Sequence, residues 1–177
     1  MSLKSTTSTV TEEMRGEDWL GDFIARIGGD TFISYRLIRG CDRMKVLAPT
    51  AGPTPASRSA DFIAGLCKDI DAEMIVIHVR SKGTKLSETE EKEAFRIFEE
   101  AAKEAGVKVQ TRLVEGDVVG SILDAAEADS VDLIVMGATG ERELKKWIKG
   151  NVLIEVMERS TVPVTIIPSA LRPDLYR

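Results

Sequence analysis

An almost wholly apolar run that ends in glycine decides the fold of this 177-residue chain: Val131-Asp132-Leu133-Ile134-Val135-Met136, followed by Gly137-Ala138-Thr139-Gly140. Residues 131–136 predict a central strand of a parallel sheet, because a strand that helices cover on both faces needs no polar face. The glycines that follow indicate a sharp turn. A second glycine-led segment, Gly150-Asn151-Val152, then opens a helix.

Outward from this run, strand-like and helix-like segments alternate from Met44 onward. Strands are predicted at residues 45–50, 73–79, 107–113, 131–136 and 162–167, with helices between them. Such repeated β-α-β units predict an α/β fold with a parallel sheet, helices on both faces and right-handed crossovers. We expect two strands at the sheet margins: 107–113, where apolar and polar residues alternate, and 162–167, where Pro163 cannot donate to a neighbouring strand.

Three local patterns place the helices. Ala56, Ala60, Ile63, Ala64 and Cys67 recur at helical spacing and predict one buried stripe, so we interpret Cys67 as a core residue. Ser87 and Glu90 fit a capping box at the start of a helix that ends at Gly106. Gly116-Asp117 is predicted to cap the next helix.

Residues 1–43 do not follow the alternating pattern and are predicted to be an N-terminal extension. Within it, residues 18–27 are amphipathic, with Trp19, Phe23 and Ile27 on one helical face. The extension could pack on its own domain or on a twin subunit, dock another protein, or touch a membrane surface. Residues 169–177 form a short C-terminal tail in this interpretation.

Composition excludes several classes of function. Lys and Arg number 24 against 29 Asp and Glu, a net charge of −5, which argues against nucleic acid as the main partner. No apolar stretch approaches the roughly 20 residues that span a bilayer, and no secretory signal is visible. The single histidine, His78, rules out a multi-histidine zinc site and a two-histidine catalytic dyad, and we expect it half-buried at a strand end. These features predict a cytoplasmic protein.

Three segments are expected to meet where the strands end, which is where open parallel sheets bind ligands. They are the segment from Pro49 to Gly52, the end of the strand at Val79, and the glycine loop from Gly137 to Gly150. Within that loop, residues 141–149 carry four basic side chains, including Arg142, against two acidic ones. A phosphate site and a plain turn both fit this pattern, since both require glycine.

The run 131–140, the segment Gly150-Asn151-Val152 and the strand containing Val162-Pro163-Val164 closely resemble the universal stress protein family, as do residues 46–50 and Gly116-Asp117. The resemblance covers about residues 44–168. It implies a doubly wound open parallel five-stranded sheet in the order 3-2-1-4-5, and a homodimer that pairs through the C-terminal strand 162–167. It also implies a nucleotide-binding set: Pro49, Thr50, Ala51, Val79, Met136, Gly137, Gly140, Arg142, Gly150, Asn151 and Val152.

Two departures from the family pattern concern this site. Asn151 replaces a hydroxyl residue, while Ala51 and Pro53 stand where the family usually has an acidic residue and a serine. The leading hypothesis is a regulatory stress-response module that binds ATP or AMP, with Mg²⁺ or Mn²⁺ held through the phosphates. The alternative is a nucleotide-free dimeric scaffold that docks a protein partner through residues 1–43. No catalytic residue is assigned, so enzyme activity is at most slow ATP hydrolysis.

Overall fold

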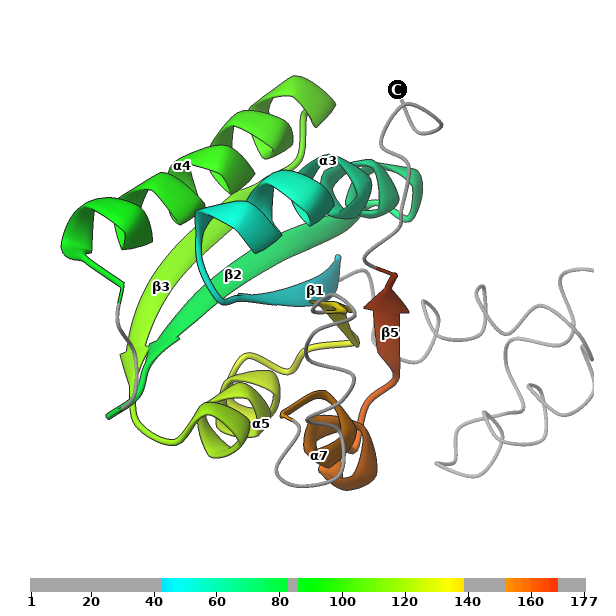
Figure 1. Ribbon diagram of the computed structural model, residues 1–177. Helices are drawn as coiled ribbons and strands as arrows, with labels where there is room; N and C mark the ends of the chain where they lie inside the picture. Colours follow the sequence, from blue (N-terminus) through cyan, green and yellow to red (C-terminus); the bar gives the residue numbers. More distant parts are fainter. Residues whose placement is uncertain (1–42, 83–85, 139–151, 169–177) are drawn as a thin grey trace, which may run out of the picture. The chain divides into compact units, whose positions relative to one another are not determined.

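The computed structural model describes residues 43–82, 86–138 and 152–168, and its centre is a parallel five-stranded sheet (Figure 1). The strand order is β3-β2-β1-β4-β5, which confirms the predicted 3-2-1-4-5 topology. The strands are β1 (Met44–Thr50), β2 (Ala72–Arg80), β3 (Val109–Glu115), β4 (Leu133–Gly137) and β5 (Val164–Ile167). The helices are α3 (Pro53–Asp69), α4 (Glu88–Ala105), α5 (Val118–Ala128) and α7 (Val152–Arg159). Among the described residues, none of the helices combines the length and the hydrophobicity that a membrane span requires.

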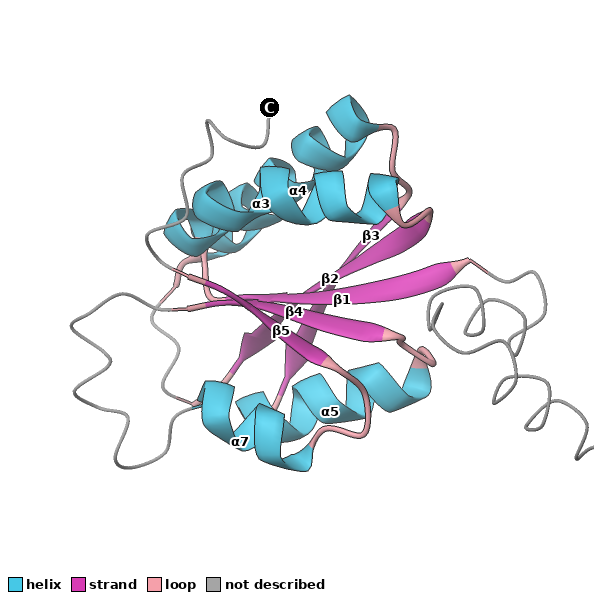
Figure 2. Ribbon diagram, turned by 90° about the vertical axis from the view of Figure 1, so that its right-hand side faces the viewer, coloured by secondary structure: helices cyan, strands magenta, loops and turns pink. Residues whose placement is uncertain are grey.

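Helices cover both faces of the sheet, with α3 and α4 on one side and α5 and α7 on the other (Figure 2). Because successive strand residues point to opposite faces, β1 sends Val46 and Ala48 into the α3–α4 core and Leu47 into the α5–α7 core. All three side chains are fully buried. The apolar central strands therefore follow from their position between two helical layers.

The predicted helix patterns are confirmed. The whole stripe of α3 is buried, and burial raises the pKa of the Cys67 thiol to about 12. At the start of α4 the Glu90 amide donates to Ser87 Oγ over 3.3 Å, and the Ser87 amide donates to Glu90 Oε2 over 2.8 Å. Gly106 ends α4 in the left-handed conformation, with φ of 73°, and Asp117 caps α5 by accepting from the Gly120 amide.

Both predicted edge positions are confirmed, but β3 and β5 begin later in the chain than predicted. Val107 lies outside β3 because its amide donates to the Ala102 carbonyl and so completes the end of α4. Pro163 precedes β5, and its carbonyl accepts from the Ile134 amide. The alternation expected through residue 113 also fails, since Leu113 is 41% exposed.

A polar clamp joins β1 to β4 near their amino ends. The Lys45 amide donates to Asp132 Oδ2 over 2.8 Å, and the Asp132 amide donates to the Lys45 carbonyl over 2.9 Å. The Lys45 ammonium also donates to the Asp129 carbonyl. These contacts fix the register of the two strands whose opposite ends form the candidate site.

Candidate functional site

The ends of β1 and β4 lie at the same level of the sheet. Leu47 pairs with Ile134, and each strand continues for three more residues, to Thr50 and Gly137. The helix after β1 packs on one face of the sheet and the helix after β4 packs on the other. This is the topological switch point, where doubly wound sheets bind their ligands.

The β1 side of the switch point is a tight turn held by Thr50. The Thr50 hydroxyl donates to the Gly52 carbonyl over 3.2 Å and accepts from the Gly52 amide over 3.4 Å. Gly52 has φ of 137°, a conformation that other residues rarely adopt. Ala51, between them, is exposed, while Pro49 is half-buried. The turn therefore presents backbone groups and the Ala51 methyl group to a ligand, and it contains no carboxylate.

The two helices at the switch point differ in the amide donors that they carry. Pro53 and Pro55 occupy the first turn of α3 and have no N–H, and no side chain caps this helix. The first turn of α7, which begins at Val152, contains no proline. Helix N-termini attract anions through their backbone N–H groups. An anionic ligand would therefore find more donors at α7 than at α3.

Gly137 is the most open of the described site residues. It is exposed at the end of β4, and no described atom lies within 4 Å of the position that a Cβ would occupy. By contrast, Val79 and Met136 are buried in the α5–α7 core. Their side chains support the floor of the switch point, and only backbone atoms at these positions could meet a ligand. Gly140, Arg142, Gly150 and Asn151 lie outside the described residues.

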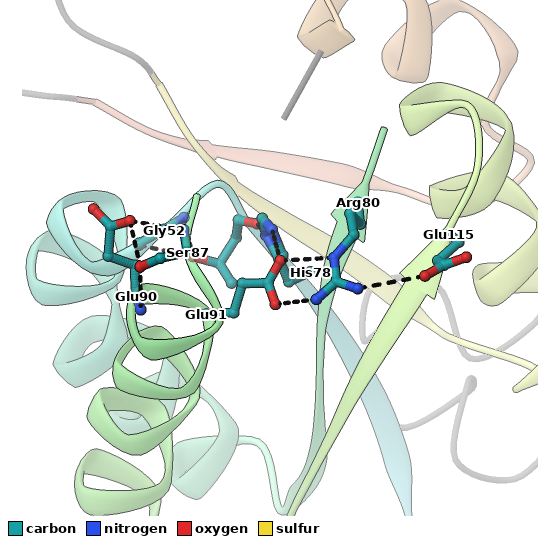
Figure 3. A network of polar contacts seen from close by, with 8 residues as sticks. Gly52, His78, Arg80, Ser87, Glu90, Glu91 and Glu115 are labelled. Atoms are coloured by element: carbon teal, nitrogen blue, oxygen red, sulfur yellow. Dashed lines mark hydrogen bonds and ion pairs between the residues drawn. The ribbon is translucent and has the colours of Figure 1, made fainter. Parts of the chain in front are cut away.

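A partly buried polar network lies next to this site, between the end of β2 and α4 (Figure 3). His78 is only 2% exposed, so its prediction as half-buried was wrong. Its Nδ1 lies 2.8 Å from the Thr50 carbonyl, and its Nε2 lies 3.8 Å from Glu91 Oε1. Arg80 binds Glu91 with two of its nitrogens and reaches Glu115 over 3.4 Å.

The Arg80–Glu91 pair sets the charge in this network. Hydrogen bonding to the Arg80 guanidinium lowers the pKa of the Glu91 carboxyl, against the opposing effect of burial. The same contact raises the pKa of Arg80. Both groups are therefore charged at neutral pH.

Glu91 and Arg80 were not predicted from the sequence. The spacing of Glu91 indicates that it is buried: it precedes Ala94 by three positions and Phe98 by seven, and so lies on the same buried face of α4. A carboxylate at such a position needs a partner. No group of three or more His, Cys, Asp or Glu side chains in the described ranges could hold a metal ion.

The strand order and the helices on both faces define a doubly wound α/β protein. The model of the universal stress protein family matches residues 43–168. The chain belongs to the universal stress protein family, as the sequence resemblance predicted.

Individual relatives agree with this assignment. Universal stress protein MJ0531 of Methanocaldococcus jannaschii is 29% identical over 152 residues, which cover 77% of this chain and 89% of that protein. The fold is similar to that of a universal stress protein crystallised in complex with cAMP, with a TM-score of 0.60, 22% identity, and coverage of 72% of this chain and 98% of that one. An Archaeoglobus fulgidus universal stress protein in complex with dAMP has a TM-score of 0.52 and 20% identity, over 72% of this chain and 99% of that one.

Proposed function

We propose that this protein binds an adenine nucleotide, ATP or AMP, at the switch point between β1 and β4, and acts as a regulatory module in a stress response. The observation that carries the proposal is the space beside Gly137, at the end of a central strand, which no atom of the described residues fills. A glycine there lets a ligand approach the backbone closely. Two relatives of the same fold, crystallised with cAMP and dAMP, support an adenine nucleotide as the ligand class.

In this proposal the two sides of the switch point have different roles. Backbone groups at Pro49, Thr50, Ala51 and Val79 would contact adenine and ribose, beside Met136. The phosphates would lie over Gly137 toward the start of α7 at Val152, where amide donors are present. Gly140, Arg142, Gly150 and Asn151 complete the proposed set. Mg²⁺ or Mn²⁺ would be bound through the phosphates of ATP.

Titration of the purified chain with ATP and with AMP by calorimetry, with and without Mg²⁺, tests the proposal. We expect saturable binding below millimolar concentration. GTP is the matched control, because it carries the same phosphates on another base. If neither ATP nor AMP produces heat of binding up to about 1 mM, the proposal is contradicted.

A second candidate is a nucleotide-free scaffold that dimerises through the C-terminal strand and docks a protein through residues 1–43. It is supported by the turn after β1, where Ala51 is exposed and two prolines remove amides from α3. Heat denaturation of freshly purified protein separates the two candidates. Released nucleotide, seen by absorbance at 260 nm, favours the first function, and its absence together with a stable dimer favours the second.

A further inference from the structure

The position of His78 between β1 and α4 fixes the location of one proton. Nδ1 lies 2.8 Å from the Thr50 carbonyl oxygen. A carbonyl oxygen can only accept a hydrogen bond, so Nδ1 carries the proton and donates. The bond is fully buried, since His78 is 2% exposed and Thr50 is 8% exposed.

The other ring nitrogen faces a fixed negative charge. Nε2 has no hydrogen-bond partner among the described residues and lies 3.8 Å from Glu91 Oε1. Glu91 is itself held by Arg80, and both of its carboxylate oxygens are used in that contact. A proton on Nε2 alone would leave the buried Thr50 carbonyl without its donor, whereas a proton on Nδ1 keeps that hydrogen bond. The two ring nitrogens therefore have different surroundings: Nδ1 faces a hydrogen-bond acceptor, and Nε2 faces a carboxylate to which it makes no hydrogen bond.

Thr50 connects the ring to the proposed site. Its carbonyl accepts from His78, and its hydroxyl holds Gly52 through two contacts. Ala51 lies between these two anchors and is the exposed residue of the turn.

We propose that His78 is a positioning residue, which donates from Nδ1 to the Thr50 carbonyl and thereby holds the Thr50–Gly52 turn in the geometry that the nucleotide requires. This inference rests on the proposed function for its ligand. The positioning itself is a property of the ligand-free protein. The residue acts through the backbone and touches no substrate.

The first experiment uses the fact that the chain contains one histidine. A long-range ¹H–¹⁵N spectrum of uniformly labelled full-length protein therefore shows the ring nitrogens of His78 alone. We expect Nδ1 to be protonated at pH 7, either as the neutral Nδ1–H form or as the imidazolium. A spectrum with bare Nδ1 and protonated Nε2 would overturn the inference.

The second experiment compares two substitutions of similar size. Asparagine places its amide nitrogen where Nδ1 lies, so His78→Asn keeps the donor, while His78→Leu removes it. We expect ATP affinity within about twofold of wild type for His78→Asn and about tenfold weaker for His78→Leu. Amide hydrogen exchange at Ala51 and Gly52, without ligand, is expected to accelerate only in His78→Leu.

The outcomes separate the inference from the proposed function. If wild type binds nucleotide and His78→Leu binds it equally well, the inference fails and the proposed function stands. If wild type binds no nucleotide, the proposed function fails, and the exchange rates and the ring spectrum still decide whether His78 positions the turn. Thermal unfolding of each variant tests whether it is folded. If His78→Leu does not fold, an unchanged exchange rate at Ala51 and Gly52 in His78→Asn supports the inference, and an accelerated rate contradicts it.

Discussion

Arg80 and Glu91 form a two-pronged ion pair that joins β2 to α4, with Nε–Oε1 at 3.0 Å and Nη2–Oε2 at 2.5 Å. Glu91 is 3% exposed, so its charge depends on this partner. Planar guanidinium and carboxylate groups suit such paired bonds, which fix orientation as well as distance. The pair therefore holds α4 at a defined position beside the end of β2, where the proposed site begins.

Glu91→Gln should change how the free energy of unfolding depends on pH below neutrality. The pKa of Glu91 is lower in the folded chain than its ordinary value of 4.5, so the carboxylate stabilises the fold above that value and loses its contribution as pH falls below it. Between pH 5 and pH 3, urea unfolding should show a steeper loss of stability in wild type than in Glu91→Gln. Equal slopes for wild type and Glu91→Gln would contradict this prediction.

Gly137→Val should fold and lose nucleotide affinity. The Gly137 backbone is not in the left-handed region, and no atom of the described residues fills the space beside it, so a strand-forming side chain fits there. That side chain would occupy the space proposed for the ligand, and we expect affinity for ATP to fall at least about tenfold in calorimetry. Gly65→Ala is the matched control: it also meets open space, and should leave binding unchanged while stabilising α3 by about 0.5–1 kcal/mol.

Gly52→Ala should destabilise the protein by about 1–3 kcal/mol, because φ of 137° with ψ of −173° is a conformation adopted almost only by glycine. The added Cβ would also lie 3.2 Å from Leu86 Cδ1. Denaturant unfolding of Gly52→Ala with and without Leu86→Ala separates the two causes. If backbone strain is the cause, Leu86→Ala should not restore the stability that Gly52→Ala loses. If Leu86→Ala restores it fully, the loss comes from the contact with Leu86.

Ser87→Ala should cost about 1 kcal/mol of stability. It removes the hydroxyl that accepts from the Glu90 amide at the start of α4, and with it one half of the capping box. Ser57→Ala is the comparison, because that exposed hydroxyl only bonds back to the Pro53 carbonyl inside α3. Chemical denaturation should place Ser57→Ala within about 0.5 kcal/mol of wild type, and an equal cost for both variants would refute a specific capping role.

Cys67 should resist thiol reagents in the native state. At pH 8 a thiol with a pKa of about 12 is ionised in about one molecule in ten thousand, and the sulfur is buried as well. In a Cys41→Ser background, iodoacetamide should label Cys67 only after unfolding in urea. Mass spectrometry measures the modification, and rapid labelling of the folded variant would show that the site opens.

Much of the fold could be predicted because its patterns are local. The period of apolar residues gives the strands and α3, and Ser87 and Asp117 mark helix starts through contacts with residues three positions away. The strand bounds were less predictable, since Val107 is drawn into the end of α4 by one backbone bond. Periodicity alone contains no information about such a bond.

The site was predictable only in outline. The ends of parallel strands must meet at one edge, so Thr50 and Gly137 could be placed together from the sequence. His78 lies opposite Thr50 in the register of β1 and β2, whereas the contact of Arg80 with Glu91 depends on how α4 packs against β2. That packing is set by the whole core, and no spacing along the chain encodes it.

The clamp between Lys45 and Asp132 has a consequence for folding. These residues lie 87 positions apart along the chain, so the junction of β1 and β4 closes the largest loop among the strand pairings of the described sheet. Closing a long loop carries an entropic cost that short β-α-β units avoid. We expect the two halves of the sheet to become ordered before they join. A ligand at the junction would bind only chains in which the two halves have joined. It would therefore stabilise the joined state and slow or oppose separation of the halves.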